Sequence, residues 1–514
     1  MEKKEERKKA PLRAAAVVTG MIVLSKIIGY IREAMINATF GESAASDAYA
    51  NATTLFSMFS LLFLSGIAST FIPIYTREKM KNGIKGANRY ANNIVNLYII
   101  VSVLVSLFAI FVLSSPGILG IFYKKSVVLT SQLARILFMT LTFSAVWGVL
   151  CNVLNANEKF LPETLQGFIL SACVMFACIK FGDIKAVTIA TALAPIFYLV
   201  SLIPFLRNTY RYEARLDLRS TNLRRTFWIA LPAIIAMEFD TINNFVDTIF
   251  ADRMMVGSTR ILKNCYQIII LLQGVFVVPV TTVSYPQLSR SAARNDKKGI
   301  IDSMKQMTEL LAVVLFPLIG IIMIMRSEVF ALLFQHGKFT AEGTARAALP
   351  LACYVVGVFG FGLRNYQSRV FYSLQKTKPP MLIGMGIVGI NILLDFVFMR
   401  VFSFGLEGLT LATSISGSLG ALIMLLTLRK MLGQMKLKVT AIQLAKTLAA
   451  AAVGSIITLL VRNIWRPTES GLMMQTVRLG ACALAGLAAY GMSAKLLHVR
   501  ALRDLMQVIR RRRK

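Results

Sequence analysis

Charged residues are scarce in this chain of 514 residues, and this scarcity argues against a soluble fold. Only 16% of the residues are charged, whereas 56% are hydrophobic, and the mean hydropathy is +0.64. A soluble protein of this size needs far more polar surface to cover its core. Acidic residues are the scarcest, because 25 Asp and Glu stand against 57 Lys and Arg and give a formal charge of +32. The composition therefore predicts a polytopic membrane protein.

Cysteine and histidine are too few and too scattered for the usual disulfide, zinc or hydrolytic sites. The six cysteines lie in apolar segments and form no C-x-x-C pair, and the two histidines are His336 and His498. The sequence has no G-x-x-x-x-G-K-[ST] motif and no H-E-x-x-H motif. We therefore expect neither a disulfide framework nor a zinc site, and a protein that is not an enzyme.

Long apolar segments dominate the remainder of the sequence. A membrane span needs about 20 mostly apolar residues, and fourteen segments meet that test: 14–37, 46–75, 88–114, 132–155, 163–181, 184–205, 224–252, 261–285, 306–325, 347–373, 380–400, 406–428, 440–461 and 472–494. The first follows a charged N-terminus and lacks a small-residue cleavage site, so we expect a retained span and not a signal peptide. The predicted fold is an all-α polytopic membrane protein.

The distribution of basic residues predicts the orientation of these spans. If the N-terminus is cytoplasmic, the inner connections with their flanking residues hold 38 Lys and Arg, and the outer ones hold 14. An excess on one side is typical of the cytoplasmic face. We therefore expect a multi-pass membrane protein with both termini in the cytoplasm. The basic tail, residues 510–514, is expected to lie against anionic lipid headgroups, and no nucleic-acid binding is expected.

Landmarks in the two halves of the chain recur at nearly one offset. The pairs are Gly41 and Gly257, 216 residues apart, Pro73 and Pro286, 213 apart, and Pro162 and Pro380, 218 apart. Two lobes of six spans each share one orientation because six is even, which predicts a parallel repeat with two extra helices at the C-terminus. The predicted parts are a basic N-terminus (1–13), an N-lobe (14–205), a basic cytoplasmic linker (206–223), a C-lobe (224–428), spans 13 and 14 (429–494) and a basic tail (495–514).

Charged side chains inside predicted spans are candidates for function, because each costs at least ~2.5–3.5 kcal/mol at the bilayer centre. The first span carries Lys26, Arg32 and Glu33, and the second opens with Asp47. Lys26 and Arg32 are separated by about 240° around a helix, so they share a direction only if the helix bends at Gly29. One interpretation is that both basic groups bind an anionic substrate beside Asp47. The other is a structural cluster of Arg32, Glu33 and Asp47.

A second set of polar residues offers oxygen atoms only. Asn391 and Asp395 are spaced i,i+4 on one helix face, Asp247 lies in the seventh span, and Thr413 lies in the twelfth. Two carboxylates, an amide and a hydroxyl suit a hard cation such as Na⁺. Alternatively, Asn391 and Asp395 hydrogen-bond between helices and stabilise packing.

Five sequence blocks carry a resemblance to a known family: SKIIGYIREA (25–34), FGESAASDAY (40–49), FIPIYTRE (71–78), LFQHGKFT (333–340) and FYSLQKTKPP (371–380). They resemble the motif blocks of the MurJ (MviN) lipid II flippases, of the multidrug/oligosaccharidyl-lipid/polysaccharide exporter superfamily. The resemblance implies fourteen helices, two lobes, and a groove for the lipid tail at spans 13 and 14.

The resemblance also implies roles for particular residues. Lys26 stands where the family usually has arginine, Arg32 matches its cavity arginine, and Asp47 matches its essential aspartate. The sodium ligands that the family implies correspond to Asp247, Asn391, Asp395 and Thr413. The chain departs from the family at Ser60 and Gln267, where arginines are common, so its anionic pocket is expected to hold fewer basic groups.

The function implied is the movement of lipid II, an undecaprenyl-pyrophosphate glycopeptide, from the inner to the outer leaflet by alternating access, for cell wall synthesis. Na⁺ or the membrane potential would supply the bias, and cell-wall synthesis proteins are candidate partners. The alternative is a flippase for another polyprenyl-pyrophosphate glycan, or a cation-coupled drug exporter of the same superfamily. A membrane glycosyltransferase is disfavoured because no outer connection exceeds about 25 residues, and a scaffold is disfavoured by the intramembrane charges.

Overall fold

The computed structural model describes residues 2–64, 67–226, 228, 239–465 and 472–503, which form helices and connecting turns without any strand. Ten of the described helices are long and apolar enough to span a membrane, or eleven if one bent pair counts as a single span. The predicted all-helical, polytopic class is therefore confirmed for this part of the chain. The total of fourteen spans stays a prediction. The basic tail at 510–514 lies outside the described residues.

The chain divides into two compact units, which are described separately. Unit 1 comprises Met1–Arg260 together with the short segment His336–Phe339, and unit 2 comprises Ile261–Gln335 and Thr340–Lys514. The sequence-predicted lobe boundary at residues 206–223 stays a prediction.

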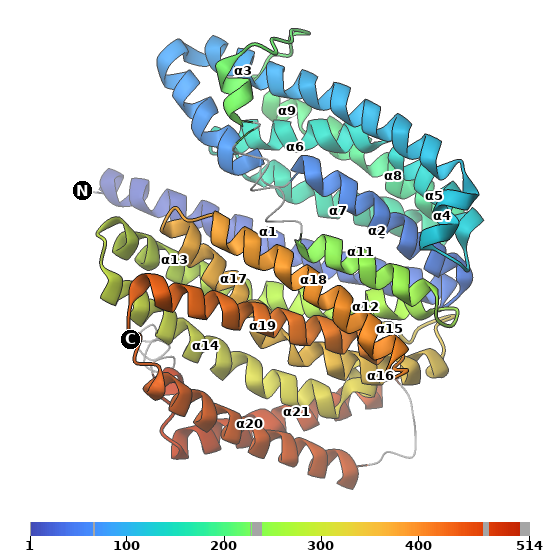
Figure 1. The fold of residues 1–514 in the computed structure, drawn as a ribbon, viewed down its shortest axis with the longest axis vertical. Helices are drawn as coiled ribbons and strands as arrows, with labels where there is room; N and C mark the ends of the chain where they lie inside the picture. Colours follow the sequence, from blue (N-terminus) through green and yellow to red (C-terminus); the bar gives the residue numbers. More distant parts are fainter. Residues whose placement is uncertain (1, 65–66, 227, 229–238, 466–471, 504–514) are drawn as a thin grey trace. The chain divides into compact units, whose positions relative to one another are not determined.

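Unit 1 consists of long helices joined by short turns (Figure 1). Its helices are α1 (Glu2–Phe40), α2 (Ala44–Leu64), α3 (Ile67–Leu113), α4 (Pro116–Phe122), α5 (Val127–Phe138), α6 (Leu141–Ala156), α7 (Leu161–Lys180), α8 (Ile184–Ser201), α9 (Ile203–Leu206) and α11 (Phe239–Asp252). The long α3 is interrupted at Gly83, whose φ of 66° and ψ of −169° are not helical. This break lies between the predicted second and third spans, where the sequence turns polar.

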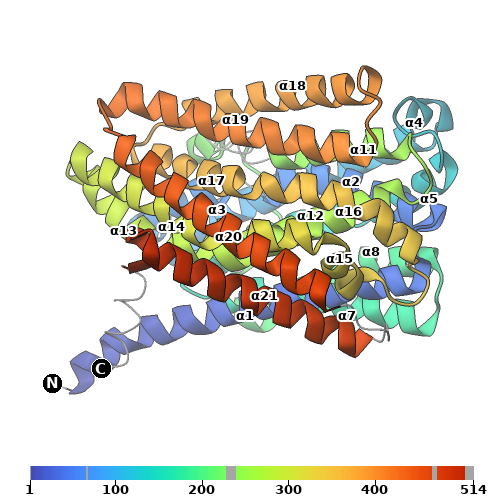
Figure 2. The same ribbon diagram turned by 90° about the horizontal axis from the view of Figure 1, so that it is seen from below.

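Unit 2 begins within α12 (Ser258–Leu272) and contains the remaining helices (Figure 2). They are η1 (Gln273–Val277), α13 (Val278–Ala293), α14 (Lys297–Ile324), α15 (Arg326–Phe334), α16 (Ala341–Val356), α17 (Val358–Ser373), α18 (Lys378–Arg400), α19 (Leu406–Leu432), α20 (Lys438–Ile464) and α21 (Leu472–Leu496). In both figures α20 and α21 lie side by side.

The predicted spans at 132–155 and 347–373 are each built from two helices. The segment predicted at 132–155 is α5 followed by α6, with a bend of 43° between them. The segment predicted at 347–373 is α16 followed by α17, with the break at Gly357. The Ser414 hydroxyl of α19 donates to the carbonyl oxygens of Cys353 (2.7 Å) and Tyr354 (3.1 Å) at the end of α16. A broken helix inside a membrane is stable when another helix binds the freed carbonyls in this way.

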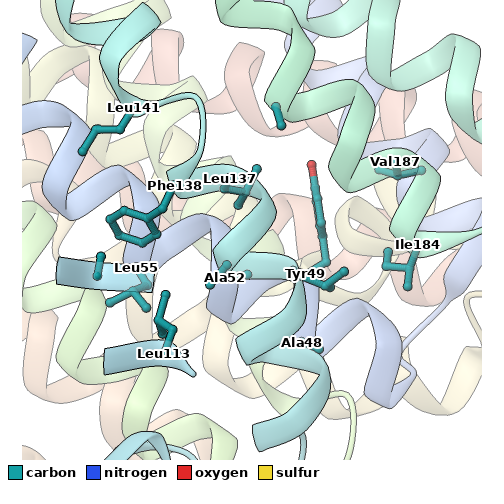
Figure 3. Packing of buried hydrophobic residues seen from close by; sticks show 14 of the residues in the cluster. Ala48, Tyr49, Ala52, Leu55, Leu113, Leu137, Phe138, Leu141, Ile184 and Val187 are labelled. Atoms are coloured by element: carbon teal, nitrogen blue, oxygen red, sulfur yellow. The ribbon is translucent and has the colours of Figure 1, made fainter. Parts of the chain in front are cut away.

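The core of unit 1 includes a dense apolar cluster between α2, α5 and α8. Leu137 and Phe138 of α5 are fully buried beside Leu55 of α2, and Val187 of α8 lies on the other side (Figure 3). The Phe138 ring also makes edge contacts with two further phenylalanines of α2, at centroid distances of 5.7 and 5.4 Å. This packing fixes α2, which carries Asp47, against the rest of unit 1.

Polar side chains of α3 bind the linker that follows α9. Asn96 donates to the carbonyl oxygens of Glu213 (3.1 Å) and Arg215 (2.9 Å) and accepts from the Tyr212 hydroxyl (2.8 Å). Asn93 accepts from the backbone N–H of Asp217 at 2.8 Å. Carboxamides can bind both backbone donors and acceptors. The asparagines of the sequence ANNIVN therefore hold the linker in place through its backbone N–H and carbonyl groups.

Candidate functional site

A cluster of buried charges joins α1 to the start of α12 within unit 1. The Arg260 side chain is completely buried, and its Nη2 lies 3.1 Å from Oε2 of Glu33. Nε of Arg260 donates to Oδ1 of Asn37 at 2.6 Å, and Nη2 donates to the backbone carbonyl of Glu33 at 3.1 Å. Glu33 and Asn37 are four residues apart, so both project from one face of α1. We call Arg32, Glu33, Asn37 and Arg260 the Glu33 cluster.

Glu33 lies between two guanidinium groups of different exposure. Its other oxygen, Oε1, is 2.9 Å from Nη2 of Arg32, whose side chain is 19% exposed. Arg260 supplies a second counter-charge that solvent does not reach. Because a buried carboxylate is stable only when it is paired, Arg260 keeps Glu33 neutralised whichever partner Arg32 has. Of these two counter-charges, Arg32 is the one that solvent reaches.

Asp47 binds the backbone at the start of α12. Its Oδ2 accepts from the N–H of Gly257 at 2.6 Å, and its Oδ1 accepts from the N–H of Arg260 at 2.8 Å. A carboxylate at a helix N-terminus binds otherwise unpaired N–H groups and interacts favourably with the helix dipole. Asp47 therefore acts here as a cap, whereas the sequence placed it beside Lys26 and Arg32.

The turns around this cap require glycine. Gly41 has a φ of +60°, and a Cβ there would lie 2.5 Å from the carbonyl oxygen of Lys338; Gly257 has a φ of +86°, and a Cβ there would lie 2.6 Å from Cβ of Glu42. The backbone N–H of Lys338 also donates to the carbonyl of Ala38 at 2.9 Å. The two landmark glycines of the sequence repeat thus occupy tight turns at one end of unit 1.

Lys26 lies apart from this cluster. Helix α1 continues through Gly29 without a break, so Lys26 and Arg32 project about 240° apart. Lys26 is exposed. The bend that the sequence allowed at Gly29 is not made, and the structure does not bring the two basic groups to one face.

A further buried carboxylate, Asp252 at the end of α11, was not identified from the sequence. Its Oδ1 accepts from Nδ2 of Asn51 at 2.7 Å, and its Oδ2 accepts from the backbone N–H groups of Lys124 (2.7 Å) and Lys125 (3.2 Å). Asp252 thereby ties the α4–α5 turn to α2 and α11. The sequence did offer a signal for Asp252, which follows Asp247 by five residues. It also offered one for Arg260, which lies one residue before a predicted span.

The candidate cation ligands of unit 2 are close together and deeply buried. Asn391 and Asp395 of α18 are each 0% exposed, and Thr413 of α19 is 9% exposed. Nδ2 of Asn391 donates to the Thr413 hydroxyl at 3.3 Å, and that hydroxyl donates to the carbonyl of Leu409 at 3.0 Å. The structure therefore brings three of the four predicted ligands to one place in unit 2. The fourth, Asp247, belongs to α11 of unit 1, where it is 1% exposed.

The two positions where the sequence departs from the expected arginines are occupied by uncharged side chains with little or moderate exposure. Ser60 of α2 is 7% exposed, and Gln267 of α12 is half-buried. The basic groups described around the site in unit 1 are thus Arg32 and the buried Arg260.

The sequence model of one protein family, described as lipid II flippase MurJ, matches residues 36–479. The chain belongs to the lipid II flippase MurJ family. The resemblance inferred from the sequence blocks is therefore confirmed. The matched region contains Asp47, Arg260 and Asp395 and begins after Arg32, so the role of Arg32 depends on the SKIIGYIREA block and on the geometry above.

Relatives of this family match nearly the whole chain. A probable lipid II flippase MurJ from Thermotoga maritima is 24% identical over 487 residues, covering 94% of this chain and 96% of the relative. A solved structure of lipid II flippase MurJ in an inward closed conformation has a TM-score of 0.77 at 21% identity and covers 96% of this chain and 100% of that one. An inward-facing multidrug resistance MATE family transporter of the MOP superfamily has a TM-score of 0.69 at 14% identity, covering 82% and 99%. The fold is that of the superfamily.

Proposed function

We propose that this protein is a lipid II flippase, which moves the lipid-linked peptidoglycan precursor across the membrane for cell wall synthesis. The observation that carries the proposal is the family match over residues 36–479. The protein acts as a transporter and not as an enzyme. It alternates between states open to either side of the membrane, as other members of the superfamily are described in inward-facing and outward-facing conformations.

The Glu33 cluster supports recognition of an anionic headgroup. A pyrophosphate is bound best by charge-assisted, bidentate contacts from arginine. Arg32 is partly exposed and can leave Glu33, because Arg260 continues to neutralise that carboxylate. We infer that Arg32 binds the pyrophosphate directly, while Asp47 acts by holding the start of α12. Lys26 projects from another face of α1, so its role in substrate binding stays a prediction from the sequence.

The proposal also includes the number and orientation of the membrane spans. We infer fourteen spans in two parallel six-span lobes and a C-terminal pair, with both termini in the cytoplasm. The 38 to 14 excess of Lys and Arg on the inner side supports this orientation. The tightly packed pair α20 and α21 would be spans 13 and 14, where the lipid tail is expected.

We also propose that unit 2 binds Na⁺ as the coupling ion. A sodium ion requires oxygen ligands, and Asp395, Asn391 and Thr413 offer a carboxylate, an amide and a hydroxyl that are all buried. The Asn391 amide nitrogen donates to the Thr413 hydroxyl at 3.3 Å, so the two side chains are within reach of one ion. That Asp247 completes the set is a prediction from the resemblance alone.

Complementation tests the proposed function. The protein is expressed as the sole flippase in a bacterium whose own flippase is depleted, and growth is scored beside the abundance of the protein in the membrane. We expect the wild-type chain to restore growth. Arg32→Ala should fail at normal abundance, and Arg32→Lys should retain part of the activity through its charge. The matched control is Arg253→Ala, which removes an exposed arginine next to the same turn.

Two results would contradict the proposal at different levels. Failure of the abundant wild-type chain would favour the rival substrate, another polyprenyl-pyrophosphate glycan or an exported drug, which the neutral Ser60 and Gln267 favour. Growth with Arg32→Ala would instead leave the flippase function intact and limit Arg32 to neutralising Glu33.

A further inference from the structure

Unit 2 contains a cavity of about 200 Å³ among α14, α17, α19 and α20. Most of its lining is apolar and includes Met304, Leu363, Leu425 and Leu444. An apolar cavity of about 150 Å³ is large enough to hold benzene, so this one can hold a stretch of hydrocarbon chain. The lining also includes Ala441, which is exposed. The cavity therefore reaches the surface of the unit.

One buried polar group faces this apolar space without a partner. Gln367 of α17 lines the cavity and is 4% exposed, and its Oε1 has no hydrogen-bond partner among the described residues. Leaving a buried acceptor unpaired destabilises the fold. A molecule in the cavity that carries a hydroxyl or an ammonium donor would remove that destabilisation.

A basic group lines the same cavity. Lys305 of α14 is 26% exposed, and its ion pair with Asp302 is 3.9 Å long to a carboxylate that is 60% exposed. Such a pair contributes little, so the ammonium remains able to bind a stronger anion such as a phosphate.

Exposed basic residues are concentrated near the cavity. The start of α14, the end of α19 and the start of α20 lie at one end of unit 2 (Figure 2). Six exposed basic residues lie at that end, namely Lys297, Lys298, Arg429, Lys430, Lys436 and Lys438. Clusters of this kind beside membrane helices attract anionic headgroups.

We propose that this cavity is a binding site for an anionic glycerophospholipid whose headgroup carries a hydroxyl, the chemistry of phosphatidylglycerol. The phosphate binds Lys305, a headgroup hydroxyl donates to Gln367, and the first part of one acyl chain lies against Met304 and Leu444. The rest of the lipid lies in the bilayer. The inference requires only that unit 2 is in a membrane, so it does not depend on the proposed substrate.

The test measures lipid affinity of the full-length protein purified in detergent, without lipid II. Phosphatidylglycerol, phosphatidylcholine and undecaprenyl phosphate are titrated separately, and the bound fraction is followed by native mass spectrometry. We expect phosphatidylglycerol to bind at least about fivefold more tightly than phosphatidylcholine, because each charge-assisted or recovered hydrogen bond is worth at least about 1 kcal/mol.

Three variants locate the site. Lys305→Gln removes the ammonium, Gln367→Leu removes the acceptor, and Ala441→Phe fills the cavity from its exposed side, where the fold tolerates a larger side chain. Each should weaken phosphatidylglycerol binding by about fivefold or more. Lys185→Gln, at an exposed lysine of unit 1 outside both the lining and the basic cluster, is the matched control and should bind as the wild type does.

Equal affinity for phosphatidylglycerol and phosphatidylcholine would overturn the proposal, as would unchanged affinity in all three lining variants. Undecaprenyl phosphate that binds more tightly and displaces phosphatidylglycerol would also overturn it, because the occupant would then be a polyprenyl chain. None of these outcomes bears on complementation, so failure here and failure of the flippase function are distinguishable.

Discussion

Replacing Arg260 with methionine should destabilise unit 1 through an uncompensated buried charge. The Arg260 side chain is 0% exposed and that of Glu33 is 7% exposed, and removing one partner of a buried ion pair typically costs about 3–5 kcal/mol. Arg32 still contacts the other oxygen of Glu33 at 2.9 Å. We therefore expect a loss near the lower limit, about 3 kcal/mol, to which the broken bond to Asn37 contributes.

The assay is thermal unfolding of the detergent-solubilised protein, followed by circular dichroism. A loss of about 3 kcal/mol should lower the midpoint by about 5 °C. The double variant Arg260→Met with Glu33→Gln removes both charges and should recover at least half of the loss, since a neutral buried pair carries no charge-desolvation cost. Arg253→Met, at an exposed arginine seven residues earlier, should change stability by no more than about 0.5 kcal/mol.

The reasoning fails if Arg260→Met unfolds within 1 °C of the wild type, or if the double variant is less stable than the single one. The first result would mean that water already reaches Glu33. The second would mean that the carboxylate contributes more through its bond to Arg32 than through Arg260.

Four further predictions concern other parts of the chain. Asp47→Ala leaves the N–H groups of Gly257 and Arg260 without their acceptor and should lower stability by about 2 kcal/mol in the same unfolding assay, whereas an unchanged midpoint would show that water replaces the carboxylate. Asn96→Leu should release the linker and make trypsin cleave after Arg215 faster than in the wild type; equal rates would contradict the role of the α3 asparagines. Asp395→Ala should abolish any sodium-dependent rise of the unfolding midpoint, with Glu407→Gln at the start of α19 as control, and sodium affinity that survives in Asp395→Ala would move the site elsewhere. A reporter fused after residue 45 should be extracytoplasmic and one fused after residue 215 cytoplasmic; a cytoplasmic signal at 45 would contradict the fourteen-span topology.

The two arginines of the Glu33 cluster differ in exposure. Arg260 is fully buried and contacts Glu33 and Asn37, whereas Arg32 is partly exposed and has one acidic neighbour. A cluster that keeps one guanidinium fixed leaves the other free to exchange partners. This difference in exposure between the two arginines is the reason for assigning the substrate contact to Arg32.

The sequence by itself determined the class of the protein and most of its helices. The predicted span 184–205 is matched by α8 (Ile184–Ser201), and 380–400 is matched by α18 (Lys378–Arg400). These predictions succeed because the cost of placing a polar residue in a membrane is local: each apolar run of about 20 residues is recognisable without its neighbours. The sequence also put Asn391 and Asp395 on one helix face, since i,i+4 spacing is a local feature. The contact of Asn391 with Thr413 of another helix required the fold.

Tertiary structure alone decided where the broken helices lie and which charges pair. The break at Gly357 is stabilised by Ser414 from a helix 57 positions away, and Glu33 pairs with Arg260, which is 227 positions away. No local pattern specifies such contacts, because any pairing that satisfies a buried charge or carbonyl is stabilising in a membrane interior. Only the packing of the helices determines which pairing forms. Asp47 shows the same limit: its position was identified from the sequence, but its role as the cap of α12 required the fold.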